Sequence, residues 1–463
     1  MPPTTLIIFG ATGDLMAKKI APALFYLFEH EKLPQNFTVV GTSRRDMARD
    51  DFREMISGIV LKHKEDAIDQ RTLDKFLDLF TFSKVEFEEE GGYRALAETL
   101  EKRDHAKGKT NRLFYLAVPP KVFTILFAQK AFTDLIKESS TGGHLSRVII
   151  EKPFGTDGAS AAILEKSLEQ CFAEEQIYRV DHYLAKDILQ SIIDFRFNNN
   201  LFEHNWNATA IESIHLRLWE TLGVEGRGAF YDHTGALRDV GQNHLLEMLA
   251  LVTMDKPQDA GAIPAKRTEI LEKLLMPSES EMASRTFRAQ HEGYVGIPEV
   301  APNSKTETYF AVRTEIDSPR WRGVPIFMEA GKRMHEQRKE IVVTLRPPYK
   351  NTIVFRLEPL EEVVIDFMTK KPGILETGIE KRSFHFKLHE MENHTQYVAE
   401  YGKMILDAVA GDQALFLGSD EVAATWAFTD AILSAWKKDI TPLVSYAPDT
   451  DEATLAAHAA LLK

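Results

Sequence analysis

The sequence predicts two domains: an α/β domain with a doubly wound parallel sheet over residues 1–178, and an α+β domain with a large, mostly antiparallel sheet and helices over residues 179–463. Three observations predict this organisation. The chain has 463 residues, which is too long for one ordinary core. In the first third, apolar strands alternate with helical segments, as in parallel sheets. From about residue 205, apolar and polar residues alternate instead, which is typical of strands with one covered face.

In the first third, short apolar runs predict strands and the stretches between them predict helices. The predicted strands are Thr5–Phe9, Phe37–Val40, Leu113–Val118 and Arg147–Glu151; the predicted helices are residues 15–31, 49–64 and a segment from Pro120 to about Lys137. In the remainder, the predicted strands cover residues 214–219, 308–316, 340–345, 352–357 and 362–368, and the predicted helices cover 243–254 and 420–437. No internal repeat or low-complexity linker interrupts either part.

Composition excludes several classes of function. The net charge is −13, so the chain has no basic surplus for nucleic acid or for an anionic membrane surface. No run of about 18 apolar residues predicts a membrane span, and the first residues do not resemble a signal peptide. The single cysteine, Cys171, suits a reducing compartment, so we expect a cytoplasmic protein. No spacing of His, Cys and Asp resembles a ligand set, and we expect no metal.

A glycine turn follows the first predicted strand and opens a helix. It consists of Gly10, Ala11, Thr12, Gly13, Asp14 and Leu15. Such a turn admits a pyrophosphate to the backbone and offers it the N-terminus of the helix. The second strand ends in Arg44 and Arg45, which suit a 2′-phosphate and favour NADP without excluding NAD. The sequence therefore indicates a Rossmann-like domain; the alternatives are an ordinary strand-to-helix turn and two solvated arginines.

Polar residues gather in three further places. Glu151-Lys152-Pro153 ends a strand at the edge where parallel sheets bind ligands. The stretch 179–186 carries a carboxylate, an imidazole, a phenol and an ammonium where we expect the two domains to join. The stretch 238–244 ends in a histidine at the start of an apolar helix. The alternatives are a Lys-Pro surface turn, a solvated helix start and a capping or core histidine.

Five motifs carry a resemblance to one family. They are Gly-Ala-Thr-Gly-Asp-Leu at 10–15, Glu-Lys-Pro-Phe-Gly at 151–155, Val-Asp-His-Tyr-Leu-Ala-Lys at 180–186, Gly-Arg-Gly-Ala-Phe-Tyr-Asp at 226–232 and Arg-Asp-Val-Gly-Gln-Asn-His at 238–244. In order and spacing, the chain resembles glucose-6-phosphate dehydrogenase from about residue 5 to residue 440. The resemblance implies oxidation of glucose 6-phosphate at C1 to the 6-phosphogluconolactone, with hydride transfer to NADP, in a homodimer or homotetramer.

The resemblance also implies roles for individual residues. His244 would be the general base and Asp181 would stabilise its cationic form. The implied substrate-binding residues are Lys152, His182, Tyr183, Lys186, Glu220, Asp239, Lys332 and Arg338; the implied cofactor-binding residues are Gly10, Ala11, Thr12, Gly13, Asp14, Leu15, Arg44 and Lys152.

The chain departs from the family pattern at several positions. Ala17 replaces a frequent lysine, Ala185 replaces a glycine, and Gln337 stands where a lysine or arginine is common. We expect Arg338 to replace that basic residue if the loop shifts. Two other functions stay open at this point: an oxidoreductase of another sugar, which the phosphate-binding set disfavours, and a non-catalytic regulatory homologue, which the retained base disfavours.

Overall fold

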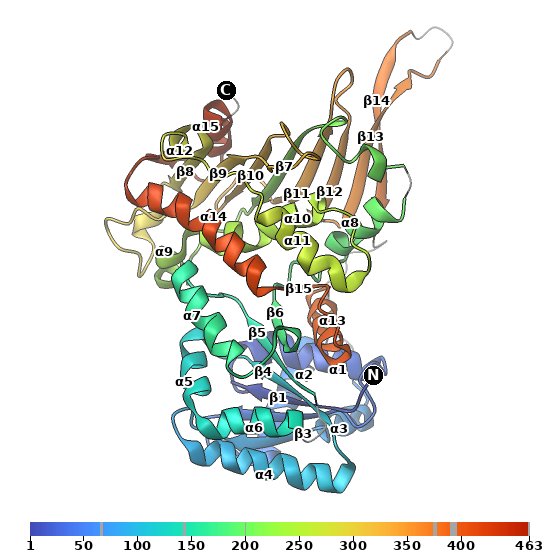
Figure 1. Ribbon diagram of the computed structural model, residues 1–463, viewed down its shortest axis with the longest axis vertical. Coiled ribbons are helices and arrows are strands. Elements are labelled where there is room, and N and C mark those ends of the chain that lie inside the picture. The colour runs from blue at the N-terminus through green and yellow to red at the C-terminus, as the bar shows by residue number, and fades with distance from the viewer. Residues whose placement is uncertain (65–67, 142–144, 200, 374–376, 389–395, 462–463) are drawn as a thin grey trace. The chain divides into compact units, whose positions relative to one another are not determined.

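The computed structural model describes residues 1–463 except 65–67, 142–144, 200, 374–376, 389–395 and 462–463 (Figure 1). Contacts between residues divide the chain into two compact units. The first unit comprises Met1–Ala185, Asp259–Pro264 and Asn393–Ser419; the second comprises Lys186–Gln258, Ala265–Glu392 and Asp420–Lys463. Among the described residues, no helix is both long enough and apolar enough to cross a membrane.

The first unit is built on a sheet of seven strands among the described residues, in the order β15-β6-β5-β4-β1-β2-β3. The strands are β1 (Thr4–Phe9), β2 (Thr38–Ser43), β3 (Phe80–Lys84), β4 (Asn111–Leu116), β5 (Ser146–Glu151), β6 (Ile177–Val180) and β15 (Phe416–Leu417). All pair in parallel except β15, which pairs antiparallel with β6. The predicted doubly wound sheet is confirmed.

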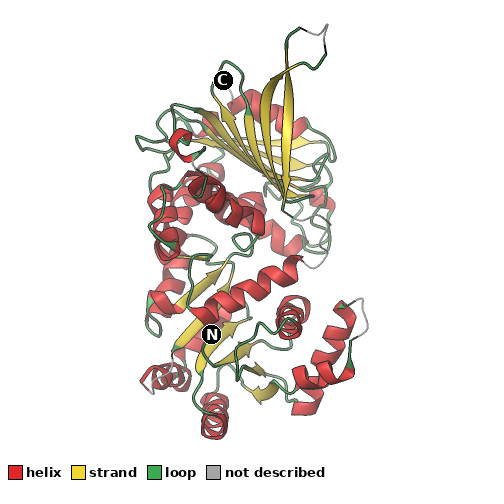
Figure 2. Cartoon of the chain, turned by 90° about the vertical axis from the view of Figure 1, so that its right-hand side faces the viewer, coloured by secondary structure: helices red, strands yellow, loops and turns green. Residues whose placement is uncertain are grey.

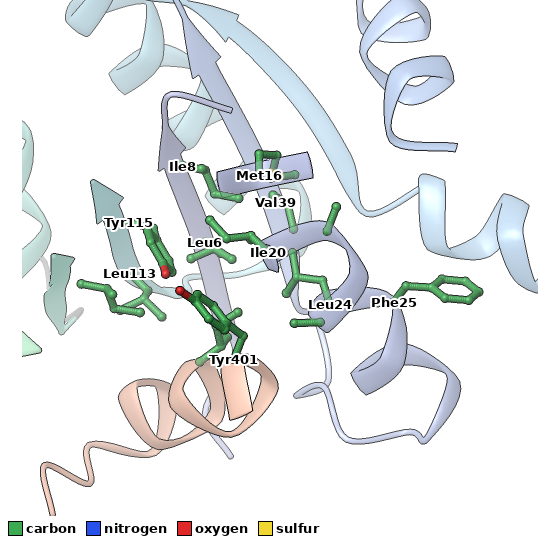
Figure 3. Packing of buried hydrophobic residues seen from close by; sticks show 14 of the residues in the cluster. Leu6, Ile8, Met16, Ile20, Leu24, Phe25, Val39, Leu113, Tyr115 and Tyr401 are labelled. Atoms are coloured by element: carbon green, nitrogen blue, oxygen red, sulfur yellow. The ribbon is translucent and has the colours of Figure 1, made fainter. Parts of the chain in front are cut away.

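Helices cover this sheet. They are α1 (Ala21–Glu29), α2 (Arg49–His63), α3 (Gln70–Leu77), α4 (Glu90–Lys107), α5 (Phe123–Ala128), α6 (Lys130–Thr141), α7 (Gly158–Glu169) and α13 (Gln396–Ala410), with a π-helical turn η1 (Met16–Ile20) before α1 and 3₁₀ turns η2 (Pro120–Val122), η3 (Glu174–Gln176) and η6 (Ala260–Ala262). One core cluster joins the sheet to η1, α1 and the distant α13 (Figure 3). The strands of this sheet are apolar along their whole length because both faces are covered.

The second unit contains a large sheet, drawn as yellow arrows in Figure 2. Its nine described strands have the order β14-β13-β12-β11-β7-β10-β9-β8-β16. The strands are β7 (Ile211–Trp219), β8 (Thr286–His291), β9 (Tyr309–Thr314), β10 (Ile326–Gly331), β11 (Arg338–Leu345), β12 (Thr352–Glu358), β13 (Glu362–Lys370), β14 (Ile379–Lys387) and β16 (Leu443–Tyr446). Only the pairs β7–β10 and β8–β16 are parallel among these strands. This confirms the predicted large, mostly antiparallel sheet.

Helices lie against both faces of the second sheet. Those lying wholly or mostly in this unit are α8 (Asp187–Phe197), α9 (Gly228–Ala236), the π-helical η5 (Leu237–Leu245), α10 (Leu246–Thr253), α11 (Ile263–Leu271), α12 (Met282–Arg285), α14 (Ser419–Lys437) and α15 (Glu452–Leu461), with 3₁₀ turns η4 (Glu203–Asn205) and η7 (Tyr294–Gly296). On one face, Phe195 of α8 packs edge-on against Phe355 of β12, 5.2 Å between ring centroids. On the other, Ala457 and Leu461 of α15 pack in a cluster with Trp219. Alternate residues of β7 therefore face two different environments.

Candidate active site

The glycine turn of the first unit has a backbone that only glycine fits at its first position. Gly10 has a φ of +88°, and a Cβ atom there would lie 2.3 Å from the carbonyl oxygen of Ala117. The N–H groups of Gly10 and Ala11 both donate to the carbonyl of Thr42, at 3.0 Å. The end of β2 therefore fixes the turn, and Gly13 stays exposed at its tip.

A cavity of about 790 Å³ opens beside this turn. Its lining includes Gly10, Thr12, Gly13, Ser43, Arg44, Arg45, Glu88, Val118, Pro119 and Lys121, which come from the carboxyl ends of neighbouring strands and the loops that follow them. Arg44 and Arg45 are exposed. Backbone N–H groups with two guanidinium groups suit a pyrophosphate and a 2′-phosphate. These residues fit a dinucleotide, and NADP better than NAD.

Lys152, the next predicted site residue, follows the end of strand β5. Glu151 is the last residue of β5, and the Lys152–Pro153 peptide that follows it is cis. The Tyr115 hydroxyl donates to Glu151 Oε1 at 2.6 Å. Lys152 is partly buried at the carboxyl edge of the parallel sheet, the edge where such sheets bind ligands.

The stretch 179–186 divides into residues with different surroundings. Arg179 is fully buried and pairs with Glu165 and Glu174, so it joins elements of the fold. Asp181 is 1% exposed and accepts a hydrogen bond from the Tyr183 N–H at 2.8 Å. The rings of His182 and Tyr183 meet edge to face at 5.0 Å.

The residue that ends this stretch opens a helix. Lys186 is the first residue of the second unit and the N-cap of α8. Its side chain is 8% exposed, far less than is usual for a lysine.

In the second unit, the predicted start of a helix at Asn243 is wrong, because η5 is already helical from Leu237, just after a break in the helix at Gly235. Asp239 and His244 both lie on η5, whose hydrogen bonds span five residues, so residues five apart come close to the same side. Gly241 permits this segment to approach β9: a Cβ atom there would lie 2.7 Å from the ring of Phe310. His244 is 2% exposed, more deeply buried than a helix start would be.

The register of strands β7 and β10 brings several charged side chains together near η5. In the parallel pair β7–β10, Gly331 lies beside Trp219, so Lys332 lies beside Glu220. Lys332 forms ion pairs with Glu220 and, at 3.3 Å, with Asp239. Burial raises the pKa of Glu220, but Lys332 and Lys339 outweigh it, so the pKa lies below its usual value.

Sequence reasoning missed Lys339. Its Nζ lies 3.5 Å from Glu220 Oε1 and 3.0 Å from Glu358, and its side chain is 10% exposed. The signal was available: in β11, Lys339 lies opposite Leu218 and shares its face of the sheet. Lys339 comes two positions after Gln337, and residues two apart on a strand lie on the same face of the sheet. The alternation of side chains along the strand would therefore have identified Lys339 as the replacement for a basic residue at position 337.

Arg338 is not brought into this group. It lies opposite Trp219 in the β7–β11 pair, so it is on the other face of the sheet. Its guanidinium group pairs with Glu336 at 2.6 Å and lies 5.2 Å from the Trp219 ring centroid. The register therefore separates Arg338 from Lys332, and the expectation that it replaces the missing basic residue has no geometric support.

That other face holds a group of metal-ligand types, His215, Glu329 and His458. A cation is already there: Arg217 donates to Glu329 at 3.0 Å and to His215 Nδ1 at 2.8 Å. His215 Nδ1 is thus an acceptor, which leaves its proton on Nε2, 2.8 Å from Glu329. The arrangement balances the buried carboxylate without a metal ion.

Known proteins match both parts of the chain. Residues 7–191 match the family model of the glucose-6-phosphate dehydrogenase NAD binding domain, and residues 193–461 match that of the C-terminal domain. Glucose-6-phosphate 1-dehydrogenase of Chlamydia pneumoniae is 34% identical over 470 residues, covering 95% of this chain and 91% of the relative. Glucose-6-phosphate 1-dehydrogenase 2 of Mycobacterium bovis is 35% identical, covering 95% and 90%.

Solved structures are similar over almost the whole chain. A glucose-6-phosphate dehydrogenase in complex with its substrate glucose-6-phosphate has a TM-score of 0.89 at 29% identity and covers 99% of this chain and 97% of its own. The enzyme from Mycobacterium avium has a TM-score of 0.83 at 30% identity, with the same coverage. Since both parts of the sequence match, and the folds agree from end to end, the chain belongs to the glucose-6-phosphate dehydrogenase family.

Proposed function

We propose that this protein oxidises glucose 6-phosphate at C1 to 6-phosphoglucono-1,5-lactone and passes the hydride to NADP, the first step of the oxidative pentose phosphate pathway. One observation carries the proposal: Lys332 and Lys339 converge on Glu220, and Lys332 also pairs with Asp239, five residues before His244 on η5. Carboxylates and ammonium groups bind sugar hydroxyls from both sides, as acceptors and donors. A buried imidazole on the same helical segment supplies a base.

In this reaction His244 takes the proton of the C1 hydroxyl. An imidazole serves as a base near neutral pH when its cationic form is stabilised. The family resemblance assigns that stabilising role to Asp181. Its carboxylate is held in one orientation by the N–H of Tyr183, 2.8 Å from Oδ1, so little reorganisation is needed when charge develops.

The substrate-binding residues divide by the chemistry that they contact. Glu220, Asp239, Lys332 and Lys339 bind the sugar hydroxyls, and the ion pairs among them exchange for contacts with the ring. His182, Tyr183 and Lys186 bind the phosphate, since an ammonium group, an imidazole and a phenol all donate hydrogen bonds to phosphate oxygens. Lys152 contacts the reacting end of the sugar.

NADP is the cofactor in this proposal. When bound, it accepts the hydride from C1. The N–H groups of Gly10, Ala11 and Gly13 bond within the fold, so the remaining N–H groups of the turn, together with the dipole of the helix that follows, bind the pyrophosphate. Arg44 binds the 2′-phosphate. Since Arg44 is exposed at the rim of the cavity, NAD also binds, with lower affinity.

The test is an absorbance assay at the reduced-nicotinamide band with glucose 6-phosphate, or with glucose, and with NADP or NAD. We expect kcat/KM to be at least about 100-fold higher for the phosphorylated sugar, because several charged contacts are lost without the phosphate. His244→Asn should lower kcat by several orders of magnitude with little change in KM. A wild-type protein with no activity on glucose 6-phosphate, or a His244→Asn variant with normal turnover, would contradict the proposal.

The proposal extends to assembly and location. The β13–β14 hairpin exposes Phe367, Ile379, Phe384 and Phe386 by 44–54% of their surface, which supports a homodimer or homotetramer with this apolar surface at an interface. The cytoplasm is the proposed location, since the single cysteine is a partly buried free thiol. We propose a cofactor domain at residues 1–178 and a substrate and oligomerisation domain at residues 179–463. The first compact unit extends further, to Ala185, and also includes Asp259–Pro264 and Asn393–Ser419.

A further inference from the structure

Glu151 is a partly buried titratable group that the proposed reaction does not use. Tyr115 on β4 lies opposite Ile149 on β5, so Glu151, two residues further along, shares the face of the sheet on which Tyr115 lies. The two side chains meet there: the Tyr115 hydroxyl donates to Glu151 Oε1 at 2.6 Å. This face belongs to the core cluster that contains α13.

A second tyrosine reaches the same carboxyl from α13. Figure 3 shows the hydroxyl groups of Tyr401 and Tyr115 pointing toward one another. Burial raises the pKa of Tyr401, and the charge of Glu151 and a hydrogen bond to it raise this pKa further. The ammonium group of Lys19 lies 5.7 Å from the centroid of the Tyr401 ring. The carboxyl of Glu151 is thus fixed by groups from two elements, β4 and α13.

The charges around Glu151 oppose one another. Burial and the negative charge of Asp181 raise the pKa of Glu151. The hydrogen bond from Tyr115 and the positive charges of Lys152 and Lys19 lower it, and the resulting pKa is about 7. The negative charges of Asp181 and Glu400 also raise the pKa of Tyr401. Glu151 therefore changes charge near neutral pH, next to two residues to which the reaction is assigned.

We propose that Glu151 is a positioning residue for the reaction: its carboxylate, fixed between Tyr115 and Tyr401, attracts the ammonium group of Lys152 and keeps it at the strand end. Protonation of Glu151 removes that attraction. The inference rests on the proposed function, because it acts through the role of Lys152 at the reacting end of the substrate. It predicts that activity at low pH falls with two protonations, one at the base His244 and one at Glu151.

The test is the pH dependence of kcat/KM between about pH 5.5 and 9. In the wild type, log kcat/KM should fall below neutral pH with a slope that exceeds one and approaches two. Glu151→Gln keeps the shape and removes the charge, so its slope should be one, with a plateau roughly 10- to 100-fold lower through misplacement of Lys152. Tyr401→Phe should shift the fall in activity that is due to protonation of Glu151 to higher pH, because the carboxylate loses a hydrogen-bond donor.

Tyr93→Phe is the matched control. Tyr93 is a fully buried tyrosine of the same unit whose hydroxyl donates to the carbonyl of Phe87, so its removal should leave the slope unchanged. A wild-type slope of one overturns the inference. So does a lower plateau in Glu151→Gln with the wild-type slope, since that outcome identifies a purely structural role.

A second readout separates this inference from the proposed function. If the wild type does not oxidise glucose 6-phosphate, the proposed function fails, and the titration of Glu151 is then read from the free energy of unfolding as a function of pH. A pH dependence that Glu151→Gln removes supports the titration of Glu151 near neutral pH. Equal pH dependence in wild type and variant overturns the inference without reference to activity.

Discussion

The ammonium group of Lys339 lies 3.5 Å from Glu220 Oε1, on the face of the second sheet that also carries Leu218. Arg338, its neighbour in the chain, points to the opposite face, where it contacts Trp219. One step along a strand thus decides which basic side chain joins Lys332 and Glu220. Side-chain alternation, rather than distance in sequence from Lys332, selects the residue.

Lys339→Met is expected to lower kcat/KM for glucose 6-phosphate by about 10- to 100-fold, mainly through KM. The variant keeps most of the buried stem and loses a charged contact, and such contacts contribute about 1.5–3 kcal/mol. Arg338→Met is the control and should change kcat/KM by less than about threefold, because exposed ion pairs contribute little. Steady-state kinetics of both variants measure this, with Tm confirming that each is folded. The reverse order of the two effects would contradict the assignment.

Arg44→Ala is expected to raise KM for NADP by about 10- to 100-fold and to leave KM for NAD nearly unchanged. A guanidinium group that binds the 2′-phosphate makes charge-assisted hydrogen bonds that NAD cannot accept. Arg94→Ala removes an equally basic side chain, 74% exposed on α4 and absent from the lining of the cavity, and should change neither constant. An equal rise in KM for NADP and for NAD would show that Arg44 does not bind the 2′-phosphate.

Much of the fold followed from local pattern, and the exceptions have physical reasons. Strands buried on both faces, such as β1 and β4, read as apolar runs and were predicted. The missed strands are β3, β6 and β15 of the first sheet and β8, β10, β14 and β16 of the second. In the first sheet, β6 mixes Tyr178 and Arg179 with apolar residues, and β15 has two residues. The packing of α13 into the first unit depends on contacts between residues more than 200 positions apart, and no local pattern predicts those.

The candidate site shows the same division. Motifs identified Asp239, His244 and Lys332 because each lies in a short, recognisable stretch. Lys339 was missed because its role depends on the strand register of β11 against β7. Tyr401 was missed for a different reason: the sequence carries no sign that α13 meets β5, so its contact with Glu151 is purely tertiary.

Gly10→Ala is expected to destabilise the first unit by about 2 kcal/mol or more and to abolish cofactor binding. The φ of +88° is unfavourable for alanine, and the new Cβ atom would lie 2.3 Å from a backbone oxygen. Gly58→Ala is the matched control, since Gly58 lies within α2 with no atom within 4 Å of its added Cβ. It should stabilise the protein by about 0.5–1 kcal/mol. Denaturant unfolding and NADP titration of both variants measure this; a Gly10→Ala variant that binds NADP normally would contradict the role of the turn.

Glu151 is expected to make the protein less stable as pH rises through neutrality. Its pKa is about 7 in the folded state against a usual 4.5, so the folded protein binds the proton more tightly than the unfolded chain. The stabilisation is fully present below pH 4.5 and is lost as pH rises through about 7. The difference between the two pKa values corresponds to at most about 3 kcal/mol.

Urea denaturation at several pH values between about 5 and 8.5 measures this dependence. Glu151→Gln should flatten the curve, because the amide does not titrate, and the variant should gain stability relative to the wild type toward pH 8. Glu101→Gln, at an exposed carboxylate on α4, should leave the curve unchanged. Stability that instead rises with pH between 5 and 7, and does so equally in the wild type and in Glu151→Gln, would mean that other carboxylates dominate and that Tyr115 and Tyr401 hold Glu151 ionised throughout this range.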